Sequence, residues 1–153
     1  MSPYRLDGET ALITGGGTGI GLGIARCFIQ AGARVVLAGR RQEELDAAVR
    51  ELGQKAFRIA MDITNFPETA ALGDQAEALV GGPVSILVNN AGIHLKKTAT
   101  DTTVEDFESV LRTHVLGAHA LTASLLPRMI ARRHGSVLFI ASMASLFGIP
   151  KVI

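Results

Sequence analysis

The chain has 153 residues, of which 48% are hydrophobic and 19% charged, and its formal net charge is +1 at pH 7. This length allows one domain with a buried core, while a charge so close to zero argues against nucleic acid or an anionic membrane as a partner. One cysteine excludes an internal disulfide, and no apolar run reaches the roughly 18 residues that a membrane helix needs. Because the opening segment 1–9 is also too polar for a signal peptide, we expect a soluble protein of the cytoplasm.

Short apolar runs alternate along the chain with longer segments of helical periodicity. The runs typical of strands, most of them apolar enough to be buried on both faces, are 11–13, 35–38, 56–60, 86–88 and 137–140. Strands separated by helices need right-handed crossovers, so this order predicts an α/β fold with one doubly wound parallel sheet. No linker or internal repeat divides the chain, and residues 1–153 are expected to belong to a single domain.

Helices are predicted after each of the first four runs. The apolar side chains at helical spacing are Ile20, Ile24, Cys27 and Phe28, then Leu45, Val49 and Leu52, then Leu72, Ala76 and Leu79, and finally Phe107, Val110, Leu111, Val115, Ala118, Leu121 and Leu125. Thr103 and Asp106 resemble a capping box at the start of the last and longest helix. Each apolar stripe is expected to face the sheet.

A glycine-rich turn joins the first predicted strand to the first helix, with the sequence Thr14-Gly15-Gly16-Gly17-Thr18-Gly19-Ile20-Gly21. Glycines allow a sharp turn and a close approach of the backbone to a ligand, and the free N–H groups at a helix N-terminus favour phosphate. A P-loop is excluded because no Gly-Lys-Ser/Thr follows, and G-x-G-x-x-G is absent, but the spacing T-G-x-x-x-G-x-G is present. The turn predicts a pyrophosphate site, with a purely packing role as the alternative.

The end of the second predicted strand bears on the choice of cofactor. In a dinucleotide-binding fold an acidic residue at this place binds the 2′-hydroxyl of NAD, whereas an arginine accommodates the 2′-phosphate of NADP. Here the chain reads Gly39-Arg40-Arg41, and the first carboxylate is that of Glu43. We therefore predict a preference for NADP(H), with NAD(H) possible; the alternative is that both arginines belong to an ordinary solvated helix start.

Three further segments complete a pattern of motifs. Asp62 follows the third predicted strand, Asn89-Asn90-Ala91-Gly92 follows the fourth, and Ala141-Ser142-Met143-Ala144-Ser145 follows the fifth. With the glycine turn, these motifs resemble the short-chain dehydrogenase/reductase family in order and spacing. The resemblance implies a three-layer Rossmann-like fold with strand order 3-2-1-4-5. It also implies cofactor contacts from Gly15, Gly17, Thr18, Gly19, Ile20, Gly21, Arg40, Arg41, Asp62, Ile63, Asn89, Ala91 and Gly92.

The family's activity is a reversible hydride transfer between a nicotinamide cofactor and a secondary alcohol or ketone. The resemblance implies that Ser142 bonds the reacting oxygen and that His94 borders the substrate. His114 stands where the family has an asparagine linked to a proton relay, so it is either a catalytic residue or a buried structural histidine.

The family also uses a Tyr-x-x-x-Lys pair, whose tyrosine would fall just beyond Ile153, while the only tyrosine here is Tyr4. We therefore expect a Rossmann domain that is incomplete at its C-terminus, with the C-terminal strands absent and the fifth strand an exposed edge. The 153 residues should be inactive alone, since a general acid or base contributes about 10²–10⁴-fold.

The residues around His94 and His114 resemble those of gluconate 5-dehydrogenase-like members of the family. They predict a sugar acid such as gluconate or ketogluconate as substrate. Lys96 and Lys97 would attract it, with an ordinary solvated loop as the alternative explanation of the two lysines. A 3-oxoacyl-carrier-protein reductase and a catalytically silent, truncated nucleotide-binding module remain alternatives. The resemblance further implies a homotetramer or homodimer. No two histidines have the spacing of metal ligands, so no metal site is predicted.

Overall fold

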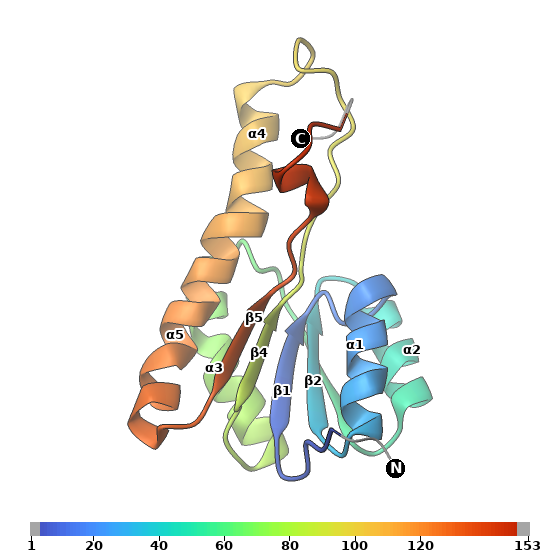
Figure 1. The fold of residues 1–153 in the computed structure, drawn as a ribbon, viewed down its shortest axis with the longest axis vertical. Coiled ribbons are helices and arrows are strands. Elements are labelled where there is room, and N and C mark those ends of the chain that lie inside the picture. The colour runs from blue at the N-terminus through green and yellow to red at the C-terminus, as the bar shows by residue number, and fades with distance from the viewer. Residues whose placement is uncertain (1–3, 150–153) are drawn as a thin grey trace.

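The computed structural model of the chain describes residues 4–149 and shows strands and helices in alternation (Figure 1). The strands are β1 Thr10–Thr14, β2 Arg34–Gly39, β3 Ala56–Ala60, β4 Ile86–Asn89 and β5 Ser136–Phe139. The helices are α1 Gly19–Gln30, α2 Gln42–Leu52, α3 Phe66–Val80, α4 Val104–Leu111, the π-helix η1 Arg112–Gly117, α5 Ala118–Arg132 and the 3₁₀ turn η2 Met143–Ser145. The predicted order of elements is therefore confirmed.

All five strands form one parallel sheet in the order β3-β2-β1-β4-β5, as predicted. In the centre of the sheet, Leu12 of β1 pairs with Val36 of β2 on one side and with Leu87 of β4 on the other. After β3 the chain crosses to the opposite side of β1. This change in direction creates a switch point between β1 and β4, where open α/β sheets bind their ligands beyond the carboxyl ends of the strands.

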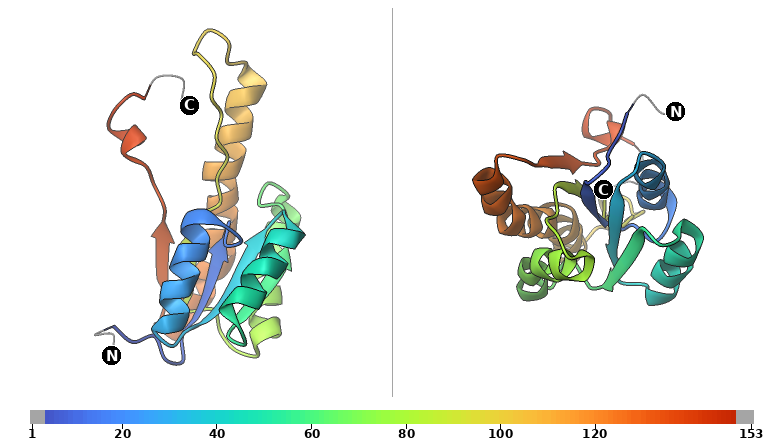
Figure 2. Two further views of the ribbon diagram at one scale, coloured as in Figure 1. Left: turned by 90° about the vertical axis from the view of Figure 1, so that its right-hand side faces the viewer. Right: turned by 90° about the horizontal axis from the view of Figure 1, so that it is seen from below.

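Helices lie on both faces of the sheet (Figure 2). The core consists of two apolar layers, one against each face. Successive residues of β1 alternate between the layers, because side chains along a strand point to opposite faces. Ala11 and Ile13 pack with side chains of α1 and α2, whereas Leu12 packs with those of α3 and α5. The helices thus cover both faces of the sheet, which is the predicted three-layer arrangement.

Helix α1 packs against the sheet through only part of the predicted apolar face, since Ile24 and Phe28 pack against the core partly buried but Ile20 and Cys27 do not. Its buried residues are Gly21 and Ala25, while Ile20 is 66% exposed and Cys27 is also exposed. The prediction of a buried Ile20 and Cys27 was therefore wrong. The reason is the close approach of α1 to the glycine turn at Gly21, where a Cβ would lie 2.3 Å from the carbonyl oxygen of Gly15. This contact sets which side of the helix faces the sheet.

The segment α4–η1–α5 forms one long helical rod whose buried face is not continuous. Leu121 and Leu125 are fully buried under the sheet, but Phe107 is 49% and Val115 53% exposed. The π-helical turn interrupts the 3.6-residue period, and α4 extends beyond the carboxyl end of the sheet (Figure 1). The prediction of a single buried stripe was correct only for the half of the rod that contacts the sheet.

The capping box predicted at the start of α4 is present. Thr103 Oγ1 accepts a hydrogen bond from the backbone N–H of Asp106 at 3.2 Å, and Asp106 Oδ2 accepts one from the N–H of Thr103 at 3.1 Å.

At the other end of the rod the chain turns into β5, which pairs only with β4 within the described sheet. As expected for an edge strand, its apolar side chains are partly exposed to solvent, with Phe139 59% exposed. Within residues 4–149, no helix has the length and apolarity required to cross a membrane.

Candidate functional site

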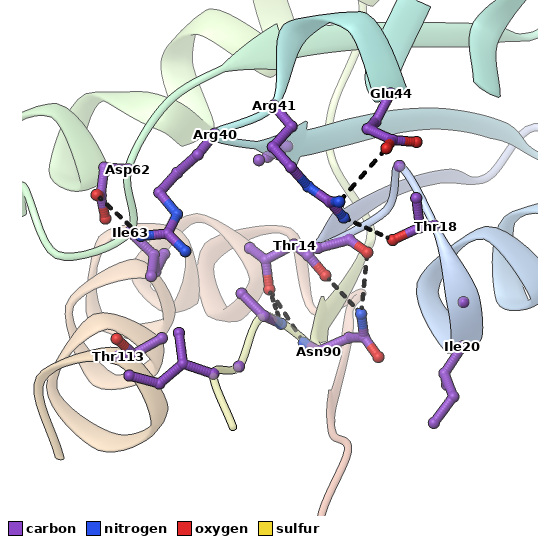
Figure 3. Close-up of a pocket in the computed structure, with 18 of the residues that line it drawn as sticks. Thr14, Thr18, Ile20, Arg40, Arg41, Glu44, Asp62, Ile63, Asn90 and Thr113 are labelled. Atoms are coloured by element: carbon purple, nitrogen blue, oxygen red, sulfur yellow. Dashed lines mark hydrogen bonds and ion pairs between the residues drawn. The ribbon is translucent and has the colours of Figure 1, made fainter. Parts of the chain in front are cut away.

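A cavity of about 520 Å³, here called the main cavity, lies at the carboxyl ends of β1, β2 and β4 (Figure 3). It occupies the switch point of the sheet, where the fold favours a ligand. Most of the predicted site residues line it, namely Gly15, Gly17, Thr18, Gly19, Ile20, Arg40, Arg41, Asp62, Ile63, Ala91, Gly92, His94 and His114. Gly21, Asn89 and Ser142 do not.

One wall of the main cavity is the glycine turn together with the N-terminus of α1. Gly15 and Gly19 adopt positive φ angles of +65° and +55°, which glycine accepts without strain. Thr18 is the N-cap of α1, yet its side chain does not cap the helix and its Oγ1 instead accepts a hydrogen bond from Arg41 at 2.9 Å. The first-turn N–H groups of α1 consequently have no side-chain acceptor within the described residues, and this end of the helix suits a pyrophosphate.

Gly21 lies behind this turn and not in the cavity. A Cβ added to Gly21 would lie 2.3 Å from the carbonyl oxygen of Gly15 and 2.6 Å from Nδ2 of Asn90. The absence of a side chain therefore allows α1 to contact the turn directly. The structure assigns Gly21 a packing role that shapes the site from outside.

A hydrogen-bond network joins the turn after β1 to the end of β4 (Figure 3). Thr14 Oγ1 donates to the carbonyl of Val88 at 3.3 Å and accepts from the backbone N–H groups of Asn90 and Ala91, both at 3.0 Å. In return, Asn90 Nδ2 donates to the carbonyls of Thr14 at 2.9 Å and Gly15 at 3.2 Å. Neither side chain was predicted to have a role, although both belong to motifs that the sequence shows.

Two guanidinium groups form the rim of the cavity at the end of β2. Arg41 contacts Thr18 and also Glu44, whose Oε1 lies 3.4 Å from Nη1. Arg40 Nη1 lies 3.9 Å from Oδ2 of Asp62. Each arginine thus has a carboxylate beside it, and Glu44, which was not predicted as a site residue, lines the cavity itself.

Asp62 is held in its ionised form by its neighbours. Burial of the carboxyl acts to raise the pKa of Asp62, but hydrogen bonds from the backbone N–H and hydroxyl of Thr64, at 2.9 and 2.8 Å, and the charge of Arg40 outweigh it and lower that pKa below its ordinary value. An ionised carboxylate accepts hydrogen bonds only. Asp62 therefore offers the cavity a hydrogen-bond acceptor.

His114 lies in the π-helical turn and faces the loop after β4. Its Nε2 is 3.0 Å from both the backbone nitrogen and the carbonyl oxygen of Ile93. The residue is exposed at the cavity wall and is not the buried core histidine that the sequence left as an alternative. The imidazole packs on Gly92, because a Cβ at that position would lie 2.5 Å from its Cε1.

Gly92→Ala should displace the His114 ring. The added methyl meets the movable end of a side chain, so we expect a modest loss of stability of about 1 kcal/mol together with altered NMR signals of the His114 ring and the Ile93 amide. The ring signals of His134, at the opposite end of the sheet, serve as an internal reference. Gly23→Ala places its Cβ in open space and should leave both His114 and Ile93 unchanged. Unaltered His114 signals in Gly92→Ala would contradict this packing.

A second cavity, of about 400 Å³, lies between the ends of β4 and β5 and the π-helical turn. It shares Thr14, Ala91 and His114 with the main cavity, whereas Asn89 lines the second cavity and not the main one. Asn89 Nδ2 donates to Thr122 Oγ1 at 3.1 Å, while its buried Oδ1 has no hydrogen-bond partner among the described residues.

Ser142 follows β5 and belongs to neither lining. Its Oγ accepts a hydrogen bond from the backbone N–H of Ala144 at 3.1 Å and caps the 3₁₀ turn η2.

Of the two lysines predicted to attract an acidic substrate, Lys97 forms an ion pair with Asp106 at 2.5 Å. Its charge therefore supports the start of α4 instead of facing the cavity.

Comparison with known proteins agrees with this geometry. The family model described as short chain dehydrogenase matches residues 9–153. The chain is 38% identical over 147 residues to the ketoacyl reductase HetN of Nostoc sp., covering 94% of this chain and 51% of that protein. It is 39% identical over 142 residues to a galactitol 2-dehydrogenase (L-tagatose-forming) of Cereibacter sphaeroides, covering 92% of this chain and 55% of that protein.

Solved structures show the same likeness. A short chain dehydrogenase/reductase family protein superposes with a TM-score of 0.89 at 37% sequence identity, over 97% of this chain and 61% of the other. The chain spans just over half the length of HetN and of the galactitol dehydrogenase.

Proposed function

Because the chain belongs to the short-chain dehydrogenase/reductase family of oxidoreductases, we propose that it forms the cofactor-binding part of an enzyme that prefers NADP(H). The observation that carries the proposal is the pair Arg40 and Arg41 on the rim of the main cavity, beside the glycine turn. Guanidinium groups bind phosphate through charge-assisted hydrogen bonds, and a 2′-phosphate distinguishes NADP from NAD. The uncapped N-terminus of α1 suits the pyrophosphate that both cofactors share.

The reaction proposed is hydride transfer between the cofactor and a secondary alcohol or ketone. The nicotinamide, when bound, supplies or accepts the hydride. Ser142 is proposed to donate a hydrogen bond to the reacting oxygen and stabilise the charge that develops on it. His94, on the cavity wall, is proposed to border the substrate, and His114 to hold the loop at Ile93 or take part in a proton relay.

The substrate proposed is a sugar acid such as gluconate or ketogluconate. The name of the galactitol dehydrogenase relative supports a polyhydroxylated substrate, whereas the name of HetN supports the second candidate, a 3-oxoacyl-carrier-protein reductase. In a protein that carries this chain together with the family's Tyr-x-x-x-Lys pair, NADPH oxidation should be faster with a ketogluconate than with a 3-oxoacyl thioester. Faster turnover of the thioester would favour the second candidate, and cofactor binding without turnover of either would favour a silent nucleotide-binding module.

Arg41→Ala tests the cofactor preference. Losing one charge-assisted contact to phosphate, worth about 1.5–3 kcal/mol, should weaken NADPH binding about tenfold or more and leave NADH binding nearly unchanged. Arg50→Ala, which removes an exposed arginine from the last turn of the same helix α2, is the matched control and should change neither. Fluorescence titration of both cofactors measures the dissociation constants. Tighter binding of NADH than of NADPH by the unmodified protein would contradict the proposal.

We further propose that the protein assembles as a homotetramer or homodimer. Support comes from apolar side chains exposed along the rod, among them Val115 at 53% and Ile130 at 65%, since contiguous apolar surface is typical of interaction sites. Light scattering on purified protein measures the mass of the assembly, and a monomer at micromolar concentration would contradict this proposal. Location in the cytoplasm stays a prediction from composition.

A further inference from the structure

The guanidinium of Arg41 lies between two groups on different elements. On one side its Nη2 donates to Thr18 Oγ1 at the start of α1, at 2.9 Å, and on the other its Nη1 lies 3.4 Å from Glu44 Oε1 in the first turn of α2 (Figure 3). All three residues line the main cavity. The cation proposed to bind a 2′-phosphate therefore already has an anionic partner inside the site.

Packing of α2 holds Glu44 in this place. The next residue, Leu45, is 1% exposed and anchors the helix in the core. On the cavity side, a Cβ added to Gly17 would lie 3.4 Å from the Cβ of Glu44, so the glycine turn runs close beside the helix. Glu44 thus faces the turn from a fixed backbone position, and its side chain is 44% exposed.

The second carboxylate near the rim is placed differently. Asp62 Oδ1 accepts hydrogen bonds from the backbone N–H and the hydroxyl of Thr64, and its Oδ2 is 3.9 Å from Nη1 of Arg40. Glu43, the neighbour of Glu44 in the first turn of α2, is exposed and does not line the cavity. Glu44 is consequently the carboxylate that touches Arg41.

We infer that Glu44 is a specificity-determining residue that lowers the ratio of the affinity for NADPH to the affinity for NADH. The inference rests on the proposed function. A 2′-phosphate dianion bound by Arg41 would share the guanidinium with the carboxylate of Glu44, and like charges at this range repel one another. The 2′-hydroxyl of NADH is uncharged and experiences no such repulsion, and it can donate a hydrogen bond to a carboxylate. Glu44 therefore weakens NADPH binding without weakening NADH binding.

Glu44→Gln separates charge from position. Glutamine keeps an oxygen that accepts from Arg41, so the guanidinium retains its place while the negative charge is removed. Removing one unit charge at close range in a water-like dielectric should tighten NADPH binding about fivefold, with NADH unchanged or slightly weaker. The gain should shrink in high salt, which screens charges beyond about 3 Å at 1 M ionic strength. Titration of adenosine 2′,5′-bisphosphate and 5′-AMP should give the same change in ratio without the nicotinamide.

Glu43→Gln is the matched control, because it makes the same change of net charge in the same helical turn and loses the same interaction with the helix dipole. It should alter both dissociation constants less than twofold. Equal effects of the two variants would overturn the inference in favour of a general field effect, and weaker NADPH binding by Glu44→Gln would overturn it in favour of a supporting role for Glu44.

The affinities of the unmodified protein for NADH and NADPH test the proposed function separately from the role of Glu44. If that protein binds NADH more tightly than NADPH, the proposed preference is lost. A rise in the affinity ratio for NADPH over NADH in Glu44→Gln but not in Glu43→Gln would still support the role of Glu44.

Discussion

Gly21→Ala is expected to lower the free energy of unfolding by about 2 kcal/mol and to weaken NADP(H) binding, although alanine is the better helix former. The new Cβ would lie 2.3 Å from the carbonyl oxygen of Gly15, a backbone atom that cannot move aside as a side chain can. Helix α1 must then shift away from the turn. Since its N-terminal N–H groups form a wall of the main cavity, the same shift disturbs the proposed pyrophosphate site.

Gly23→Ala makes the same change two residues along helix α1 and is the control. Its Cβ would have no heavy atom within 4 Å, so the variant should be as stable as the unmodified chain or more stable by up to about 1 kcal/mol. Urea unfolding gives the stabilities, and NADPH titration gives the affinities. Equal stability of the two variants would show that α1 does not depend on its contact with Gly15.

Thr14→Val is expected to cost about 2–4 kcal/mol of stability, although the two side chains have nearly the same shape. Thr14 is 3% exposed, and its hydroxyl accepts from the backbone N–H groups of Asn90 and Ala91. Valine leaves both partly buried groups without that acceptor, and an unsatisfied donor costs about 1–3 kcal/mol when it is fully buried. The amides of Asn90 and Ala91 should also exchange hydrogen faster, because they lose the bond that protects them.

Thr14→Ser keeps the hydroxyl and removes only a methyl group. It should cost about 1 kcal/mol and preserve the protection of both amides, as measured by urea unfolding and hydrogen exchange. If serine and valine destabilise the chain equally, the hydroxyl contributes little and the loss comes from packing alone.

Much of the fold could be predicted because it depends on local pattern. Apolar runs of strand length separated by helical periodicity lead to a parallel sheet, and the capping box of Thr103 and Asp106 marks the start of α4. The predictions failed where a contact between elements overrides the pattern. Ile20 and Cys27 were expected to be buried, but the contact of Gly21 with the turn decides which side of α1 faces the sheet.

The candidate site was likewise predictable where residues close in sequence create it. The glycine turn and the arginines after β2 each follow a strand, and all carboxyl ends of a parallel sheet meet at one edge. The partners of these residues were not predictable. Glu44 approaches Arg41 only because α2 packs beside the glycine turn, and the π-helical turn that brings His114 to Ile93 leaves no simple periodic signal.

By itself, then, the sequence determined the alternation of strands and helices and the edge of the sheet at which the cavity lies, because hydrophobic periodicity and the backbone freedom of glycine act over a few residues. Its motifs identified the family, and the strand order followed from that resemblance. Only the tertiary structure decided that Thr14 accepts from Asn90, 76 residues away, and that a carboxylate stands beside the cation at the rim. Pairings of this kind depend on the distances between packed elements, which periodicity does not encode.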